Sequence, residues 1–469
     1  MNYNINETEM QLSFEISSNF LRIPSNLDNF NNTETVTGIS KSERTVYCFN
    51  GNITIKDVDR YCPNCGSFMH INGHTNINLR HLCFGSSLTC LNFSNPQLLC
   101  PNCNHTRMNP ISFKANNHRI TKELYQYTIE LLACGKYTNK QVAEITGLGK
   151  NTVKDIDLKR LKDKYTLDDK LIKPTNKVKY LGIDEFKLHD GHIYATHIID
   201  METGHILFIS HGKKKQVVYD FVDYVGLDWM DSIEAIACDM NSDFEEAFQE
   251  KCPHIQIVFD YFHIVKNFND KVISEVRKDE EKRLREEGNI EGAKLLKRTK
   301  YILTSSRSTL KKKDEEAKEN KVISKGSTLF NKIEVTRKEG NEKKYDELIK
   351  ENELLFTADI VKEKLTVAYK RDSEYEMAND ITEIIDICNS TKNKHFKWFA
   401  RLLDNHFEGI IAHATYKISA GKIEGINNKI KTLRRQGYGY PDDEYFFLKL
   451  IDMSRNEYIR NVKSHKICD

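Results

Sequence analysis

The sequence lacks an excess of charge of either sign, a long apolar run and a signal-like leader. Its 469 residues carry 70 Lys and Arg against 68 Asp and Glu, a net charge of +2. This balance excludes a histone-like basic protein and confines any nucleic-acid surface to a local patch. No apolar run approaches the roughly 18 residues that cross a bilayer, and the first 30 residues contain acids but no apolar core. We therefore expect a cytosolic protein whose cysteines are thiols or metal ligands rather than disulfides.

The chain contains enough apolar material for several domains. Hydrophobic residues make up 39% and charged residues 29%, which excludes wholesale disorder. At roughly 100–200 residues per domain, the length suggests about three domains. Residues 1–45 are rich in Asn, Ser and Thr and are expected to form a loose arm with a little local structure. A small cysteine-rich domain is expected at 46–113 and a basic helical domain at 114–165, followed by a polar link.

Two near-identical CPNC turns, Cys62–Cys65 and Cys100–Cys103, stand out in the cysteine-rich domain. Each turn aims two thiolates at one point, and two such turns make a tetrahedral sulfur site that suits structural zinc. A thiol-rich segment without metal is the alternative. The remaining cysteines of this domain lack a partner turn and are expected to be core thiols, although metal binding by them stays open: Cys48, Cys83 and Cys90.

The basic segment has the plan of a helix-turn-helix. Helical spacing at 121–133 and 139–146 is followed by the turn Gly147-Leu148-Gly149 and by a further helix from Lys150. Across residues 114–162 there are ten Lys or Arg against five Asp or Glu. The alternative is an ordinary three-helix packing unit. As a DNA-binding element, the last helix would present four side chains to a major groove: Lys150, Asn151, Thr152 and Lys154.

From Lys179 the pattern changes to strands. Three β-rich runs separated by short turns are followed by alternating helix and strand. This is the order of elements in an RNase H-like α/β domain, whose first part we place at 178–264. Residues 265–412 are charged and helical and are expected to be an insertion that acts as a spacer or dimerisation arm. Residues 413–458 would return to the α/β domain.

Three carboxylates fall at informative positions in this pattern. Asp184 lies in the first strand, Asp239 directly follows the fourth, and Glu424 lies in a polar helical run far downstream. In an RNase H-like fold these elements are neighbours, so the three acids can meet in one cleft. Two Mg²⁺ or Mn²⁺ ions, about 3.5–4 Å apart, would then support in-line attack on a phosphodiester. Single acids at strand ends are more often turn caps, and other nearby acids are expected to be solvated: Glu185, Asp190 and Asp243.

Further polar groups accompany these acids. Asp260 and His263 follow the last strand, so that His263 either touches the scissile phosphate or pairs with Asp260. Residues 413–440 contain six Lys or Arg and one acid; a basic face beside Glu424 would grip DNA phosphates, unless it is a solvated helix face. Trp398 is expected in the core rather than stacked on a base. The DNA-gripping set at helical spacing after Glu424 comprises Asn427, Asn428, Lys431, Arg434 and Arg435.

Together these blocks resemble the DDE transposases of the bacterial insertion-sequence group usually called ISL-three. The matching stretches are the CPNC turns, the helix-turn-helix, LGIDEFKLHDGHIYATHIID, ACDMNSDFEEAFQEKCPHIQIVFDYFHIVKN and GKIEGINNKIKTLRRQGYGY, from about residue 60 to 455. By this match the family's catalytic acids fall on Asp184, Asp239 and Glu424. One departure is Ser419-Ala420, where the family often has Ser-Asn.

The resemblance implies a fold and a function. The fold is an α/β RNase H-like catalytic domain with a long α-helical insertion, preceded by a small zinc-binding domain and an all-α helix-turn-helix domain. The function is Mg²⁺-dependent DNA strand cleavage and 3′-hydroxyl strand transfer, in a cytoplasmic, nucleoid-associated homodimer or larger assembly without membrane contact. The partners are double-stranded terminal inverted repeats and target DNA. Two alternatives stay open: a zinc and helix-turn-helix regulator without catalysis, and another RNase H-like nuclease or integrase.

Overall fold

The computed structural model divides into two compact units. One combines Met1–Ile172 with Leu433–Asp469, and the other is Lys173–Thr432. No helix among the described residues is long and apolar enough to cross a membrane. Residues 1–29 of the expected arm, Ala420 and residues 456–458 of the expected C-terminal segment lie outside the described part of the chain. The structure describes residues 30–240, 242–319, 322–325, 334–336, 339–419, 421–437 and 439–455.

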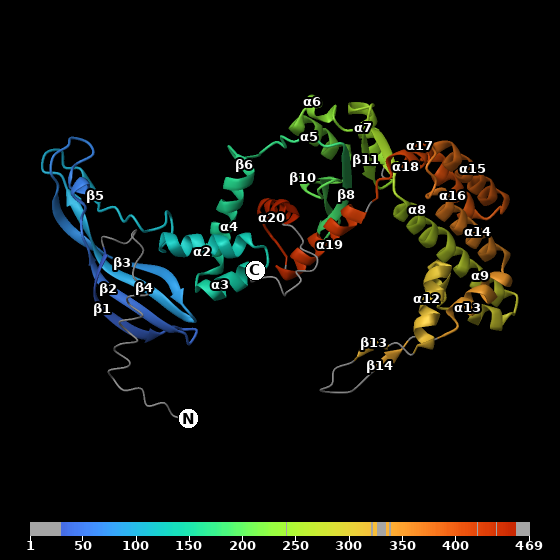
Figure 1. Ribbon diagram of the computed structural model, residues 1–469, viewed down its shortest axis with the longest axis horizontal. Helices are drawn as coiled ribbons and strands as arrows, with labels where there is room; N and C mark the ends of the chain where they lie inside the picture. Colours follow the sequence, from blue (N-terminus) through green and yellow to red (C-terminus); the bar gives the residue numbers. More distant parts are fainter. Residues whose placement is uncertain are drawn as a thin grey trace, which may run out of the picture. The chain divides into compact units, whose positions relative to one another are not determined.

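The first unit begins with a five-stranded sheet (Figure 1), in which β2 and β4 are parallel and the other neighbours antiparallel. The order is β1-β2-β4-β3, with β5 on β4. Phe49, Leu79, Leu91 and Phe93 bury one face of the sheet. The short helix η2 (Asp57–Arg60) precedes β3. The strands are β1 (Phe30–Ile39), β2 (Thr45–Ile53), β3 (His70–Phe84), β4 (Ser87–Leu99) and β5 (Thr106–Met108).

Two expectations for this region are wrong. Strand β1 falls in the expected loose arm; it buries Phe30 and leaves most of its other side chains exposed, so no alternating apolar pattern marked it. Cys48 and Cys90, expected as core thiols, form a disulfide because they are register partners on the parallel strands β2 and β4. The Cys83 thiol donates to the backbone carbonyl oxygens of Ile145 and Thr146.

The helices expected in the basic segment are present. Thr138 forms a capping box with Gln141 at the start of α3, and Gly147, at φ 70°, ends α3 in the left-handed conformation that glycine adopts without strain. A small hairpin of β6 (Thr166–Leu167) and β7 (Lys170–Leu171) follows. The helices are α2 (Lys122–Ala133), α3 (Asn139–Thr146) and α4 (Lys150–Tyr165).

Helix α20 (Asp443–Arg455) packs against α4 and belongs to the first unit. The expectation that all of residues 413–458 return to the α/β domain is therefore wrong from Leu433 onward. The reason is a set of buried charged contacts between α4 and α20, which no local sequence pattern reveals.

The second unit contains a mixed sheet in the order β10-β9-β8-β11-β12. Strands β8, β9 and β10 are antiparallel, and β11 is parallel to both β8 and β12. Leu181 and Ile183 of β8 share a core with helices α5 and α7, whereas a Cβ on the intervening Gly182 would meet Ile423 of α19. The elements are β8 (Tyr180–His189), β9 (Ile193–Asp200), β10 (Ile206–His211), α5 (Lys215–Val225), α6 (Leu227–Met230), β11 (Ala235–Cys238), α7 (Ser242–Lys251), β12 (Gln256–Phe259) and α19 (Gly421–Gln436).

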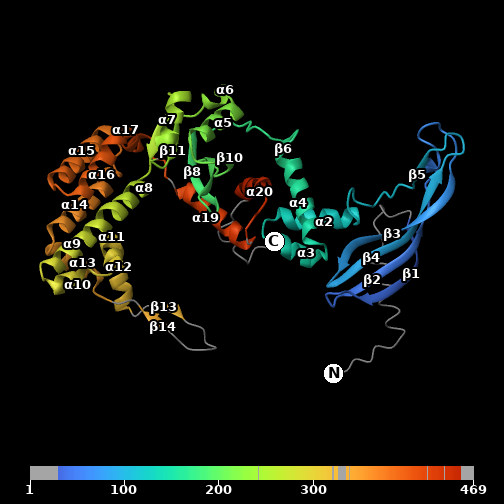
Figure 2. The same ribbon diagram turned by 180° about the vertical axis from the view of Figure 1, so that it is seen from behind.

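Residues between β12 and α19 form a helical bundle, as Figure 2 shows from behind. The bundle comprises α8 (Tyr261–Asn267), η3 (Phe268–Ile273), α9 (Ser274–Glu286), α10 (Ile290–Leu296), α11 (Lys300–Thr304), α12 (Arg307–Lys318), α13 (Asn341–Lys350), α14 (Glu353–Ala368), α15 (Glu374–Ser390), α16 (Lys394–Asn405), α17 (Phe407–Ile411) and α18 (His413–Tyr416). It also holds a hairpin of β13 (Val322–Lys325) and β14 (Glu334–Thr336), so it is not purely helical.

The bundle is not a solvated spacer. Its buried side chains, Phe268 and Phe399 among them, belong to the same hydrophobic cluster as Phe259 of β12 and Ile183 of β8. Trp398 is 38% exposed, so the expectation that it lies in the core is wrong. The charged helix faces that suggested a spacer are therefore only the outer faces of a packed bundle.

Two helical glycines give a matched test of this packing. A Cβ at Gly409 of α17 would lie 2.5 Å from the Phe259 ring, whereas a Cβ at Gly425 of α19 would meet nothing within 4 Å. We expect Gly409→Ala to lower the free energy of unfolding by about 1–3 kcal/mol through overpacking. Gly425→Ala should raise it by about 0.5–1 kcal/mol, because alanine restricts the unfolded chain. Urea unfolding of both variants checks the signs; equal effects would contradict the packing.

Candidate active site

Asp184 and Asp239 lie at the same level of two neighbouring strands. Strands β8 and β11 are parallel, with Ala237 opposite Gly182. Continuing that register by two residues brings Asp239, directly after β11, beside Asp184. Sequence reasoning expected this pair, because charged residues in or just after buried strands are costly unless they are used.

Asp184 is a half-buried carboxylate held at both oxygens. Its Oδ1 accepts the backbone N–H of Glu185 at 2.8 Å, and its Oδ2 accepts the side-chain amide of Asn427 at 2.6 Å. Burial raises the pKa of Asp184, and the charge of Asp239 adds to this, although the two hydrogen bonds and His263 partly oppose the rise. A carboxylate in this position gains from a nearby cation.

Asp239 is paired with His263. Asp239 Oδ1 accepts the Met240 N–H at 2.7 Å and lies 3.3 Å from His263 Nδ1. Burial raises the pKa of Asp239, but His263, the Met240 N–H and Lys266 together outweigh burial and leave it below its usual value. Burial lowers the pKa of His263, yet Asp239, Asp184 and Asp260 together outweigh burial and leave it raised. His263 Nδ1 faces Asp239, while Asp260 caps α8 by accepting the Phe262 N–H and acts on His263 through its charge.

Helix α19 packs on the strand that carries Asp184, but the structure does not gather Glu424 with the two aspartates into a metal-binding group; among the described residues the only such group is formed by cysteines. Ile423 lies over Gly182, where a side chain would collide with it, and Asn427 bonds to Asp184. Glu424 follows Ile423 directly and lies one turn before Asn427, and it is exposed. The contacts of Ile423 with Gly182 and of Asn427 with Asp184 thus fix the turn of α19 that carries Glu424.

Asn427 was expected to grip DNA, but its amide nitrogen is engaged by Asp184. The other basic and polar residues of that set remain on the surface of α19: Asn428, Lys431 and Arg435 are exposed, and Arg434 is half-buried. Sequence reasoning missed the role of Asn427, although one signal existed. Asn427 lies within the buried stripe formed by Ile423, Ile426 and Ile430.

The four residues expected to face a major groove lie in the first unit and differ in their exposure and contacts. Lys150 and Asn151 are exposed in the first turn of α4, and Thr152 is half-buried. Lys154 Nζ lies 2.7 Å from Asp442 and over the Tyr445 ring. Lys154 is thus already engaged by Asp442 and Tyr445, and its contact with a major groove stays a prediction.

The two CPNC turns converge as expected. Cys62 lies 3.5 Å from Cys103, and Cys65 lies 3.5 Å from Cys100, between sulfur atoms. All four sulfurs lie within 4.8 Å of one another. Zinc–sulfur bonds of about 2.3 Å in a tetrahedron require sulfur separations of about 3.8 Å, so the cluster suits a metal ion such as zinc.

The backbone of each CPNC turn is built in the same way. The N–H of the first cysteine donates to a carbonyl five residues on, Ser67 or His105, and the residue after the second cysteine takes a left-handed conformation, at Gly66 and Asn104. Hydrogen bonds from Ser67 and the neighbouring thiols lower the pKa of Cys65 to about 6. The His105 backbone N–H lowers the pKa of Cys103, but hydrogen bonds with the other three thiols, together with burial, outweigh it and raise that pKa to about 12. Without a metal the thiolate is therefore favoured at Cys65 and not throughout the cluster.

Comparison with known proteins gives the class of this chain. A family model of the DDE transposases of the ISL-three group, described as "Transposase", matches residues 181–450, more than half of the chain. The chain therefore belongs to this family, and the resemblance seen in its motifs is confirmed. It is a DNA-processing enzyme of an insertion sequence. One curated relative is the transposase for insertion sequence element IS1001 from Bordetella parapertussis, 27% identical over 390 residues that cover 83% of this chain and 87% of the relative.

Proposed function

We propose that this transposase binds the terminal inverted repeats of its element, cuts a strand at each end with Mg²⁺ or Mn²⁺, and joins the freed 3′-hydroxyl to target DNA. The observation that carries the proposal is the Asn427–Asp184 hydrogen bond, which ties the helix bearing Glu424 to the strand bearing the first aspartate. The strand order and the mixture of antiparallel and parallel pairs support an RNase H-like domain. Since two ends are processed together, the active form is a homodimer or a larger assembly.

Asp184, Asp239 and Glu424 are the proposed metal ligands. Their donor set fits, because hard divalent ions prefer carboxylate oxygens with water and phosphate. The negative charge of Asp239 raises the pKa of Asp184, and a bound cation would relieve this repulsion between the two carboxylates. Two bound ions would activate the attacking water or 3′-hydroxyl and stabilise the leaving oxygen.

Two neighbouring side chains support these ligands. Asn427 fixes the orientation of the Asp184 carboxylate through Oδ2. His263 faces Asp239, and its raised pKa favours the imidazolium, which would put a positive charge beside the proposed metal ligands. The exposed Lys431 and Arg435 of α19 would contact DNA phosphates.

Asn427 gives a prediction specific to this site. Asn427→Asp keeps the shape of the side chain but replaces the amide donor with a second negative charge. We expect single-turnover cleavage at saturating DNA to fall by about tenfold to a hundredfold, because a hydrogen bond to a charged group contributes about 1.5–3 kcal/mol. Thr432→Ala, at an exposed position of the same helix outside the expected DNA-gripping set, should leave that rate within about threefold. Equal rates for the two variants would contradict the positioning role of Asn427.

In the first unit, DNA binding is assigned to the basic helices and a structural role to the cysteine cluster. Lys150 and Asn151, with Thr152 at their side, form the turn of α4 that faces outward. Cys62, Cys65, Cys100 and Cys103 would hold structural zinc with no open position for catalysis.

The proposal is tested with purified protein, labelled element ends and a supercoiled target. We expect Mg²⁺-dependent nicking at the ends, followed by covalent joining of end DNA to the target. Binding without metal-dependent cleavage would favour a zinc and helix-turn-helix regulator instead. Cleavage without any strand transfer would favour another RNase H-like nuclease.

A further inference from the structure

Helix α20 is joined to α4 by a buried carboxylate at the middle of α4. Asp157 is fully buried. Its Oδ1 accepts Arg160 Nε at 2.9 Å, and its Oδ2 accepts the Tyr445 hydroxyl at 2.6 Å and Lys449 Nζ at 2.7 Å. Two of these three donors come from α20, so Asp157 depends on α20 for most of its hydrogen bonds.

A second buried carboxylate lies on α20 and accepts its hydrogen bonds from α4. Asp452 of α20 accepts Arg160 Nη2 at 2.9 Å, Lys164 Nζ at 3.0 Å and the Tyr165 hydroxyl at 2.7 Å, all from α4. Burial raises the pKa of Asp452, but these donors outweigh burial and leave it lowered. Arg160 bridges both carboxylates, so the two sites form one network.

The N-terminal ends of α3 and α4 are tied to the same helix. Asn139 donates its amide to the Tyr445 hydroxyl at 2.7 Å, and Lys154 pairs with Asp442. Tyr445 therefore links α3, α4 and α20 through one hydroxyl group. Helix α20 is a fourth helix of this small domain rather than a peripheral tail.

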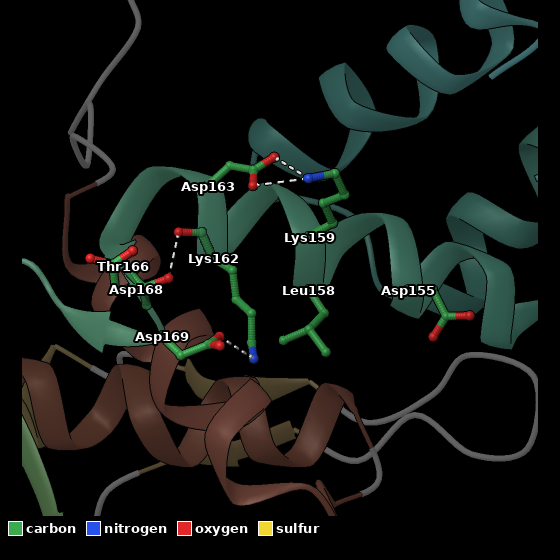
Figure 3. A pocket seen from close by; sticks show the side chains of 8 residues that line it. All are labelled: Asp155, Leu158, Lys159, Lys162, Asp163, Thr166, Asp168 and Asp169. Atoms are coloured by element: carbon green, nitrogen blue, oxygen red, sulfur yellow. Dashed lines mark hydrogen bonds and ion pairs between the residues drawn. The ribbon is translucent and has the colours of Figure 1, made fainter. Parts of the chain in front are cut away.

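The C-terminal half of α4 is unsuited to a DNA groove on its remaining face. Figure 3 shows a hollow there, lined in part by Asp155, Asp163, Asp168 and Asp169. Its two lysines are already paired, Lys159 with Asp163 and Lys162 with Asp169. An acidic hollow repels phosphates, so the first turn of α4 is the part of the helix left for DNA.

We propose that α20 completes the DNA-end-binding domain, and that Asp157 and Asp452 are positioning residues that hold α4 so that Lys150 and Asn151 reach the DNA end-on. This inference rests on the proposed function. It assigns residues far downstream of α4 to end recognition, and it gives the Lys154 side chain a bracing role.

The test uses the full-length chain with Asp452→Ala, which leaves Arg160 and Tyr165 without their shared acceptor. Glu444 lies on α20 like Asp452, but it is exposed, and its contact with α4 is a surface ion pair with Lys162 at 2.9 Å; Glu444→Gln is therefore the matched control. We expect Asp452→Ala to raise the half-saturating concentration of end DNA by about tenfold or more. Binding of random duplex and the cleavage rate at saturating end DNA should stay within about threefold of the wild-type values. The control should change none of the three.

A second variant separates positioning from folding. Arg160→Met with Asp452→Leu replaces the central ion pair by apolar side chains of similar volume, which often preserves stability. If α4 is held by the network, this double variant regains the wild-type unfolding midpoint but only part of the end affinity. End affinity equal to the wild type in a folded Asp452 variant would overturn the inference. A wild-type chain without preference for end DNA would instead overturn the proposed function itself.

Discussion

Replacing Asp184, Asp239 or Glu424 by alanine is expected to abolish strand cleavage and strand transfer while end binding persists. Each replacement removes a carboxylate proposed to hold a divalent ion. The ions contribute several kcal/mol of charge stabilisation to an in-line displacement, and about 4 kcal/mol corresponds to a rate loss of about a thousandfold. Single-turnover cleavage of labelled ends with Mg²⁺ measures the loss, and gel-shift titration measures binding.

The adjacent residue supplies the control for this experiment. Glu185 follows Asp184 on β8 and therefore points to the other side of the sheet, where it lies 3.9 Å from Lys213. Glu185→Gln should leave the cleavage rate within about threefold. A variant that retains full cleavage would remove that acid from the catalytic set, and loss of end binding together with cleavage would indicate a folding defect instead.

The two aspartates are readable from the sequence because of where strands end. A carboxylate within or just after a buried strand is costly, and parallel neighbours bring such positions to one edge of the sheet. The strands themselves were visible as short β-rich runs separated by turns. Glu424 could be found only through the family resemblance, since its helix is separated from β12 by the whole helical bundle.

Buried polar residues in apolar stripes were the signals that sequence reasoning passed over. Asn427 lies between Ile423 and Ile430 on one face of α19, and Asp452 lies one turn from Leu448 on the buried side of α20. A polar group in such a position needs a partner. The sequence could therefore predict that each has one, but not which, because the partners lie 243 and 292 positions away.

Strand β1 and the Cys48–Cys90 disulfide could not be predicted from local sequence patterns, for a different reason. An edge strand with one buried side chain gains most of its order from backbone pairing, which any sequence can supply. Cys48 and Cys90 become neighbours only through the parallel pairing of β2 with β4, and the order of strands in a sheet is a property of the whole domain.

Removing metal from the cysteine cluster is expected to unfold that end of the first sheet. Apparent zinc-binding energies of about 10–16 kcal/mol match or exceed the 5–15 kcal/mol that typically stabilises a whole domain. The local core beside the cluster is small: Met69 and Leu98 pack with Cys62 and Cys100. This core is separate from the one that contains Leu91 and Phe93. Unfolding should therefore begin at the CPNC turns and spare the centre of the sheet.

Hydrogen exchange can resolve this difference between the two ends of the sheet. In Cys100→Ser, or after chelation, the amides of Gly66 and Asn104 should lose protection, because their turn hydrogen bonds to Cys62 and Cys100 depend on the closed cluster. The amides of Leu91 and Phe93 should stay protected. Cys134→Ser, at an exposed cysteine outside the cluster, should change neither the zinc content of about one per chain nor the exchange pattern. Unchanged protection after complete chelation would show that the turns hold without metal, and the cysteines would then be a packing feature only.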